Sequence, residues 1–105
     1  MFKSFIGAAA VVCSSVATAA ATKGVVVYDR GCGSRLIVET SMGYVLAEWF
    51  GGSVPYEGDT LIGELESYGM KEIYILNRKS DTRLWIEDYM LSRSRVVEKL
   101  TNKCG

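Results

Sequence analysis

Short strand-forming segments follow one another closely along this chain, and that succession most constrains its fold. Each segment is rich in β-branched or aromatic residues and is bounded by glycine-containing or polar turns. The segments are residues 24–29, 35–40, 44–50, 60–67, 72–77 and 82–88. Tight turns of this kind join antiparallel neighbours. The sequence therefore predicts a mainly β domain, an antiparallel meander of five to six strands that curls into a small barrel.

The longest glycine-rich segment, residues 51–59, is the best loop candidate. It runs into "PYEGDTLIGEL", residues 55–65, which resembles the Pro-x-x-Gly-Asp turn that leads into a strand in OB-like and SH3-like barrels. The resemblance implies an OB/SH3-like barrel as the fold class. It implies nothing about function, since such barrels host many functions.

The hydrophobic period changes near the end of the chain. From Val96 on, apolar residues recur at positions 96, 97, 100 and 104, which lie on one face of a helix. Ser92 or Ser94 can serve as N-cap. We therefore expect one C-terminal α-helix over Arg93–Lys103.

Residues 1–21 have the composition of a secretory signal peptide. A positive start at Lys3 precedes a long uncharged stretch of small and apolar residues, with alanines suited to cleavage between Ala19 and Ala21. The stretch is too rich in alanine, serine and threonine for a membrane-spanning helix. We expect a single domain over residues 22–105, exported to the periplasm or secreted, with no membrane span after removal of a signal that is bacterial in type.

Loss of the signal peptide, which contains Cys13, leaves Cys32 and Cys104. In an oxidising compartment these two cysteines form one disulfide, and closing a loop of roughly 70 residues stabilises the fold by about 4 kcal/mol. The setting of Cys32 in "DRGCGSR" also suggests a nucleophile in a cationic loop. The chain has no histidine to activate a thiol, so the disulfide is the preferred interpretation.

Composition argues against several other chemistries. The chain has 12 basic and 12 acidic residues, a balance unlike that of most nucleic-acid-binding proteins. The absence of histidine and of a Cys-x-x-Cys or calcium-loop motif argues against a metal site. We expect no cofactor, no metal and no nucleic-acid partner.

Glu64 and Glu66 are the remaining catalytic candidates. They lie two positions apart in the predicted strand 60–67, so both side chains share one face, where they could act as general acid and base. A solvent-facing strand surface explains the same pattern. A carboxylate-dependent enzyme is therefore only the less favoured alternative.

Alternation along the strands sorts the aromatic residues. It places Val45, Ala47, Trp49, Ile73, Ile75, Leu84 and Ile86 inside the barrel. It places outside a second group of residues, Tyr44, Leu46, Glu48, Phe50, Glu72, Tyr74, Arg83, Trp85 and Glu87. Tyr44, Tyr74, Arg83 and Trp85 are the predicted binding residues, an exposed aromatic patch flanked by Glu64 and Glu66.

Two structural alternatives apply to this patch. The C-terminal helix covers it, with Val96, Val97 and Leu100 against Tyr74 or Trp85, or a homodimer buries it. If neither holds, the sequence predicts a small exported, non-catalytic binding module whose partner is another protein or an envelope component. A secreted effector, or its neutralising inhibitor-type partner, would have the same sequence features.

Overall fold

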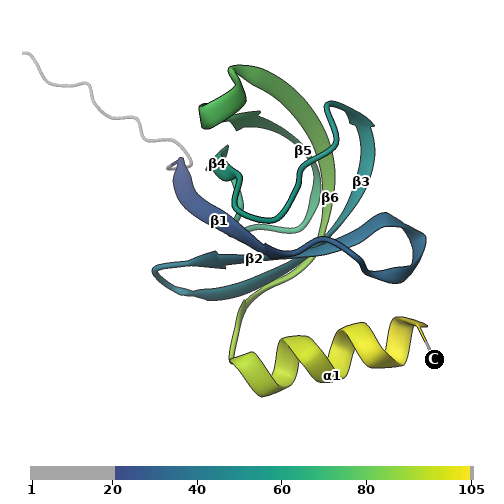
Figure 1. Ribbon diagram of the computed structural model, residues 1–105. Coiled ribbons are helices and arrows are strands. Elements are labelled where there is room, and N and C mark those ends of the chain that lie inside the picture. Colours follow the sequence, from purple (N-terminus) through teal and green to yellow (C-terminus); the bar gives the residue numbers. More distant parts are fainter. Residues whose placement is uncertain (1–20, 105) are drawn as a thin grey trace, which may run out of the picture.

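The computed structural model describes residues 21–104, which form a closed, antiparallel, six-stranded barrel followed by one α-helix (Figure 1). The strands are β1 (Thr22–Tyr28), β2 (Arg35–Thr40), β3 (Gly43–Gly52), β4 (Thr60–Gly63), β5 (Gly69–Ile75) and β6 (Ser80–Leu91). The helix α1 is Arg93–Cys104. The mainly β barrel with a C-terminal helix is thus confirmed. The predicted signal peptide lies outside the described residues, apart from Ala21.

The strands do not follow a single meander. Around the barrel their order is β1-β2-β3-β6-β5-β4, so two three-strand meanders face each other and β1 closes the barrel against β4. The loop between β3 and β4 is hydrogen-bonded to β1 just before β4 begins. Gly58 N–H donates to the Val26 carbonyl at 2.8 Å, and Val26 N–H donates to the Asp59 carbonyl at 2.9 Å.

The barrel interior is filled by aliphatic side chains from all six strands and from the turn after β4. They are Val26, Leu36, Val38, Val45, Ala47, Leu61, Leu65, Ile73, Ile75, Leu84 and Ile86. All of the aliphatic residues that alternation placed inside are buried here, and Trp49 packs against them half-buried. The alternation expected for strands with one buried face is therefore confirmed on β3, β5 and β6.

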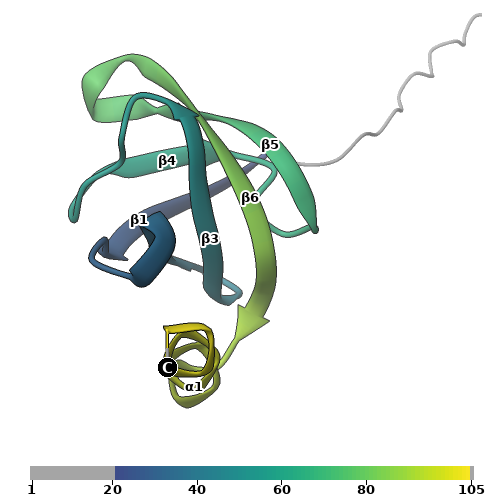
Figure 2. The same cartoon turned by 90° about the vertical axis from the view of Figure 1, so that its right-hand side faces the viewer.

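A second, smaller cluster lies outside the barrel, between its wall and α1. It consists of Ile37, Leu46 and Val96, each at most 5% exposed. Figure 2 shows α1 nearly end-on beside the barrel, on the side of β3. Leu46 points out of the barrel as expected, and α1 covers it.

The predicted strand 60–67 is too long. β4 ends at Gly63, where a Cβ atom would lie 2.5 Å from Ile73 Cδ1. The chain then turns, with Leu65 N–H donating to the Gly63 carbonyl at 2.9 Å, and Leu65 still reaches the core. Glu64 and Glu66 therefore do not share the face of a strand.

A cap and a disulfide define the two ends of α1. Ser92, not Ser94, caps the helix: its Oγ accepts a hydrogen bond from Arg95 N–H at 3.2 Å. At the other end Cys104 is bonded to Cys32 in the turn between β1 and β2, with 5.4 Å between the Cα atoms. The predicted disulfide is confirmed, and Gly33 adopts the left-handed φ of 62° that this turn requires.

Asp59 organises the turn that resembles Pro-x-x-Gly-Asp. Its buried carboxylate accepts hydrogen bonds from Tyr56 N–H at 2.8 Å, Asn77 Nδ2 at 2.9 Å and Arg78 Nη2 at 2.7 Å. Burial by itself disfavours the charged form. The hydrogen bonds and the guanidinium charge outweigh burial and lower the pKa of Asp59 below its ordinary value.

The lowered pKa of Asp59 predicts an acid-sensitive contribution to stability. A carboxyl whose pKa is depressed on folding stabilises the protein fully above its unfolded pKa of about 3.9, and the contribution is lost as the pH falls further. We expect Asp59→Asn to lower the free energy of unfolding by about 1–3 kcal/mol at pH 7. The difference from the unaltered protein should shrink below about pH 4. Urea titrations at several pH values measure this, with the exposed Asp81→Asn as control; a difference independent of pH would contradict the account.

Gly24 gives a test of barrel closure. It is paired with both Thr40 of β2 and Leu61 of β4, and a Cβ atom there would lie 2.6 Å from Val38 Cγ1. We expect Gly24→Ala to destabilise the barrel by about 1–3 kcal/mol through overpacking.

Gly51→Ala is the matched control for Gly24→Ala, because the nearest atom to its Cβ would be Arg83 Nη1 at 3.5 Å. Chemical denaturation should show a change within about 0.5 kcal/mol for this variant. Equal losses of stability in the two variants would show that β1 is not packed between β2 and β4 as described.

Candidate functional site

The outer surface of β5 and β6 carries three large apolar side chains that solvent reaches. Met70 is 44% exposed, Tyr74 is 38% exposed and Trp85 is 42% exposed. Met70 lies directly opposite Trp85 in the register, and the next outward pair is Glu72 with Arg83. We call Met70, Glu72, Tyr74, Arg83 and Trp85 the β5–β6 face.

An ion pair divides the apolar residues of the β5–β6 face. Arg83 Nη2 lies 3.2 Å from Glu72 Oε2, and both side chains are more than half exposed. Tyr74 is opposite Asp81, beyond this pair, while Trp85 and Met70 are on its other side. The face therefore presents a Trp–Met unit, then an ion pair, then a tyrosine.

The structure brings together three of the four predicted binding residues. Trp85, Arg83 and Tyr74 share the β5–β6 face, but Tyr44 does not belong to it. Tyr44 is opposite Leu91 at the far end of β6, four residues along β3 from the partner of Trp85, or roughly 13 Å at the ordinary rise of a strand, and it packs beside α1.

The helix therefore covers only part of the predicted patch. Val96 and Leu100 pack in the cluster that includes Tyr44, on the β3 side of the barrel. Tyr74 and Trp85 remain exposed. The expectation that α1 covers Tyr74 or Trp85 is wrong, because the disulfide and the short connection after β6 hold the helix against β3.

Glu64 and Glu66, the expected flanking carboxylates, have separate partners. Glu64 lies 3.5 Å from Lys71 Nζ, and it accepts a hydrogen bond from Ser67 Oγ at 3.4 Å. Glu66 Oε2 accepts a hydrogen bond from Thr40 Oγ1 at 2.7 Å. These contacts tie the turn after β4 to its neighbours, and they give the two carboxylates structural roles.

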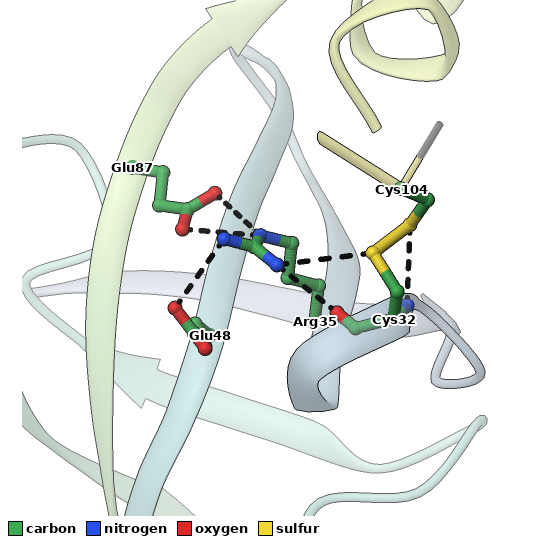
Figure 3. Close-up of a disulfide and its surroundings, with 5 residues drawn as sticks. All are labelled: Cys32, Arg35, Glu48, Glu87 and Cys104. Carbon is green, nitrogen blue, oxygen red and sulfur yellow. Dashed lines mark hydrogen bonds and ion pairs between the residues drawn. A yellow bond between two sulfur atoms is a disulfide. The ribbon is translucent and has the colours of Figure 1, made fainter. Parts of the chain in front are cut away.

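Sequence reasoning missed a charged cluster that borders the β5–β6 face. Arg35 Nε lies 3.2 Å from both carboxylate oxygens of Glu87, and its Nη2 lies 3.6 Å from Glu48 Oε1 (Figure 3). The hydrogen bond from Arg35 to Glu87 raises the pKa of Arg35, so the guanidinium stays charged. The outward positions predicted for Glu48 and Glu87 were the signal that could have revealed this cluster.

The charged cluster and the β5–β6 face form one continuous row. In the register Arg35 is opposite Glu48, Glu48 is opposite Trp85, and Trp85 is opposite Met70. The row thus crosses β2, β3, β6 and β5 on the outside of the barrel. A half-exposed tryptophan lies at its centre, with an ion-paired carboxylate on one side and a methionine on the other.

A groove runs between α1 and the barrel. Its volume is about 550 Å³, within the range of small-molecule sites. The walls are mainly apolar, and its lining includes Val27, Ile37, Tyr44, Val96 and Leu100. Tyr44 therefore belongs to this groove.

The structure adds two findings on other classes of site. In residues 21–104, no three histidine, cysteine, aspartate or glutamate side chains gather as a set of metal ligands would. The helices of this same part of the chain include none with the length and apolar character that crossing a bilayer requires.

Comparison of the chain with protein-family models, with curated proteins and with solved structures found no match.

Proposed function

We propose that the protein is a small exported, non-catalytic binding module of the cell envelope or the secreted fraction. It captures another protein through the β5–β6 face. The observation that carries the proposal is the Trp85–Met70 pair, which lies exposed on a sheet surface that α1 leaves open.

The chemistry of the β5–β6 face suits recognition of a protein. Tryptophan, tyrosine and arginine contribute most often to the energetic centre of protein interfaces, and methionine adapts its shape to a partner surface. Trp85, Met70 and Tyr74 supply the apolar contacts, and the Glu72–Arg83 pair supplies one charge of each sign. A partner with an apolar pocket edged by polar groups fits this arrangement.

The surroundings of Trp85 favour a preorganised contact. Glu48, its register neighbour on β3, is held by Arg35, and Arg35 is held in turn by Glu87. A side chain whose neighbours are already fixed loses less conformational entropy on binding. This stiffness favours the β5–β6 face as the contact surface.

Substitution of Trp85 tests the proposal. We expect Trp85→Ala to weaken partner binding by about 2 kcal/mol or more, which is roughly a 30-fold rise in Kd. The folded state should persist, because Trp85 lies outside the core. The partner captured from envelope extract or culture medium by the unaltered protein is purified, and its Kd is measured by calorimetry.

A matched methionine pair supplies the control. Met70→Ala should weaken binding, whereas Met42→Ala should not, although Met42 is 53% exposed in the turn between β2 and β3. Unchanged Kd for Trp85→Ala and Met70→Ala, or failure of the unaltered protein to retain any partner, would contradict the proposal.

A further inference from the structure

The Cys32–Cys104 disulfide lies at the surface, where it fastens a lightly packed helix. Cys104 is exposed, and Cys32 is half-exposed in the turn before β2. Of the residues of α1, only Val96 is buried, while Val97 is 50% exposed. The disulfide holds the C-terminal half of α1 on the barrel together with two other contacts, the packing of Leu100 and an ion pair of 3.1 Å between Lys99 Nζ and Asp88 Oδ2.

A recess opens beside the disulfide. It has a volume of about 480 Å³ and is lined by Tyr28, Arg30, Gly31, Cys32, Leu100, Thr101 and Cys104. Among the described residues Arg30 forms no ion pair, so its positive charge remains available to an incoming anion. A thiolate is such an anion, and it is the reactive form of a thiol.

The two sulfur atoms have different surroundings. Arg35 Nη1 lies 3.8 Å from Cys32 Sγ and donates to the Cys32 carbonyl at 3.2 Å (Figure 3). Within residues 21–104, Cys104 Sγ accepts only a neutral backbone donor, Cys32 N–H, at 3.3 Å. A guanidinium stabilises a leaving thiolate more than a neutral N–H does. The geometry therefore favours Cys32 as the leaving group and the more exposed Cys104 as the sulfur under attack.

We propose that the Cys32–Cys104 disulfide is a thiol–disulfide exchange site for an external dithiol and that its reduction releases α1. One thiolate of the dithiol attacks Cys104 Sγ, a new S–S bond forms there, and the electron pair of the broken bond leaves with Cys32 as a thiolate beside Arg35. The second thiol of the dithiol, as its thiolate, then displaces Cys104. The dithiol is oxidised to a disulfide, and Cys32 and Cys104 are reduced. This inference does not rest on the proposed function.

Reduction should free the helix without unfolding the barrel. The interior cluster of the barrel includes no residue of α1, so it stays closed. An isolated helix of this length is marginal in water. Its release uncovers Ile37 and Leu46, which α1 now covers, and creates an apolar surface that exists only in the reduced state.

The direction of attack is tested by trapping the first intermediate. The oxidised protein is treated briefly with the monothiol N-acetylcysteine, quenched with acid and mapped by peptide mass spectrometry. We expect the adduct on Cys104. An adduct mainly on Cys32 overturns the assignment of the leaving group.

Reduction rates with dithiothreitol test the two arginines. Arg35→Met should slow reduction about three- to tenfold by removing the positive charge beside the leaving sulfur, and Arg30→Gln should slow it about twofold. Lys23→Gln removes one exposed positive charge at the other end of β1 and should leave the rate unchanged. Equal rates in all variants overturn the proposed role of the recess. Folding of each variant is checked by circular dichroism, and Arg35→Lys, which keeps the charge, should recover part of the rate.

Hydrogen exchange tests the release of α1. Opening the disulfide removes the covalent link between the C-terminal end of α1 and the barrel, so amides of residues 97–104 should exchange about a hundredfold faster in the reduced protein and in Cys104→Ser. Amides of β3 and β6 should keep their protection. Unchanged exchange in α1, or an equal loss of protection in the strands, overturns the proposal.

Discussion

The packing of Val96 against Leu46 and Ile37 determines which surface of the barrel is covered and which remains open. Leu46 points outward from β3, so in an isolated barrel it would expose an apolar side chain. The helix follows β6 after a single residue, Ser92, and is therefore confined to the end of the barrel where β3 and β6 meet. The Cys32–Cys104 disulfide then sets its direction across β2 and β3. With the helix so placed, the β5–β6 face remains open to solvent.

Arg35 connects these two surfaces. Its guanidinium contacts the Cys32 carbonyl on one side and the carboxylates of Glu48 and Glu87 on the other. Glu48 is the cross-strand neighbour of Trp85, so one side chain lies between the disulfide turn and the centre of the β5–β6 face. The Arg35 side chain is only 17% exposed, and ion pairs at that degree of burial are screened less than exposed pairs. These ion pairs give the β5–β6 face a fixed charged border, although the formal net charge of the chain is zero.

The sequence indicated the features that depend on local pattern. Alternation identified the aliphatic barrel interior, the 3.6-residue period identified α1, and cysteine counting identified the disulfide. Strand order was not accessible in this way, because the pairings of β3 with β6 and of β1 with β4 join segments far apart in the sequence and leave no periodic signal. The burial of Leu46 was missed for the same reason: alternation separates the two faces of a strand and does not say what later packs on the outer one.

The candidate site was predicted in part. Outward positions on β5 and β6 correctly grouped Tyr74, Arg83 and Trp85, since these strands are neighbours and in regular register. Tyr44 was grouped with them by type and not by distance along the strands. The Arg35 cluster needs the pairing of β2, β3 and β6, and a register spanning three strands cannot be read from one segment.

Both the exposure of the β5–β6 face and the burial of Leu46 depend on the position of α1. Methyl nuclear Overhauser spectroscopy of the oxidised protein measures it directly. The structure predicts contacts from the Val96 methyl groups to those of Leu46 and Ile37, and none to the ring protons of Trp85. Contacts from Val96 to Trp85 or Tyr74, with none to Leu46, would contradict the account.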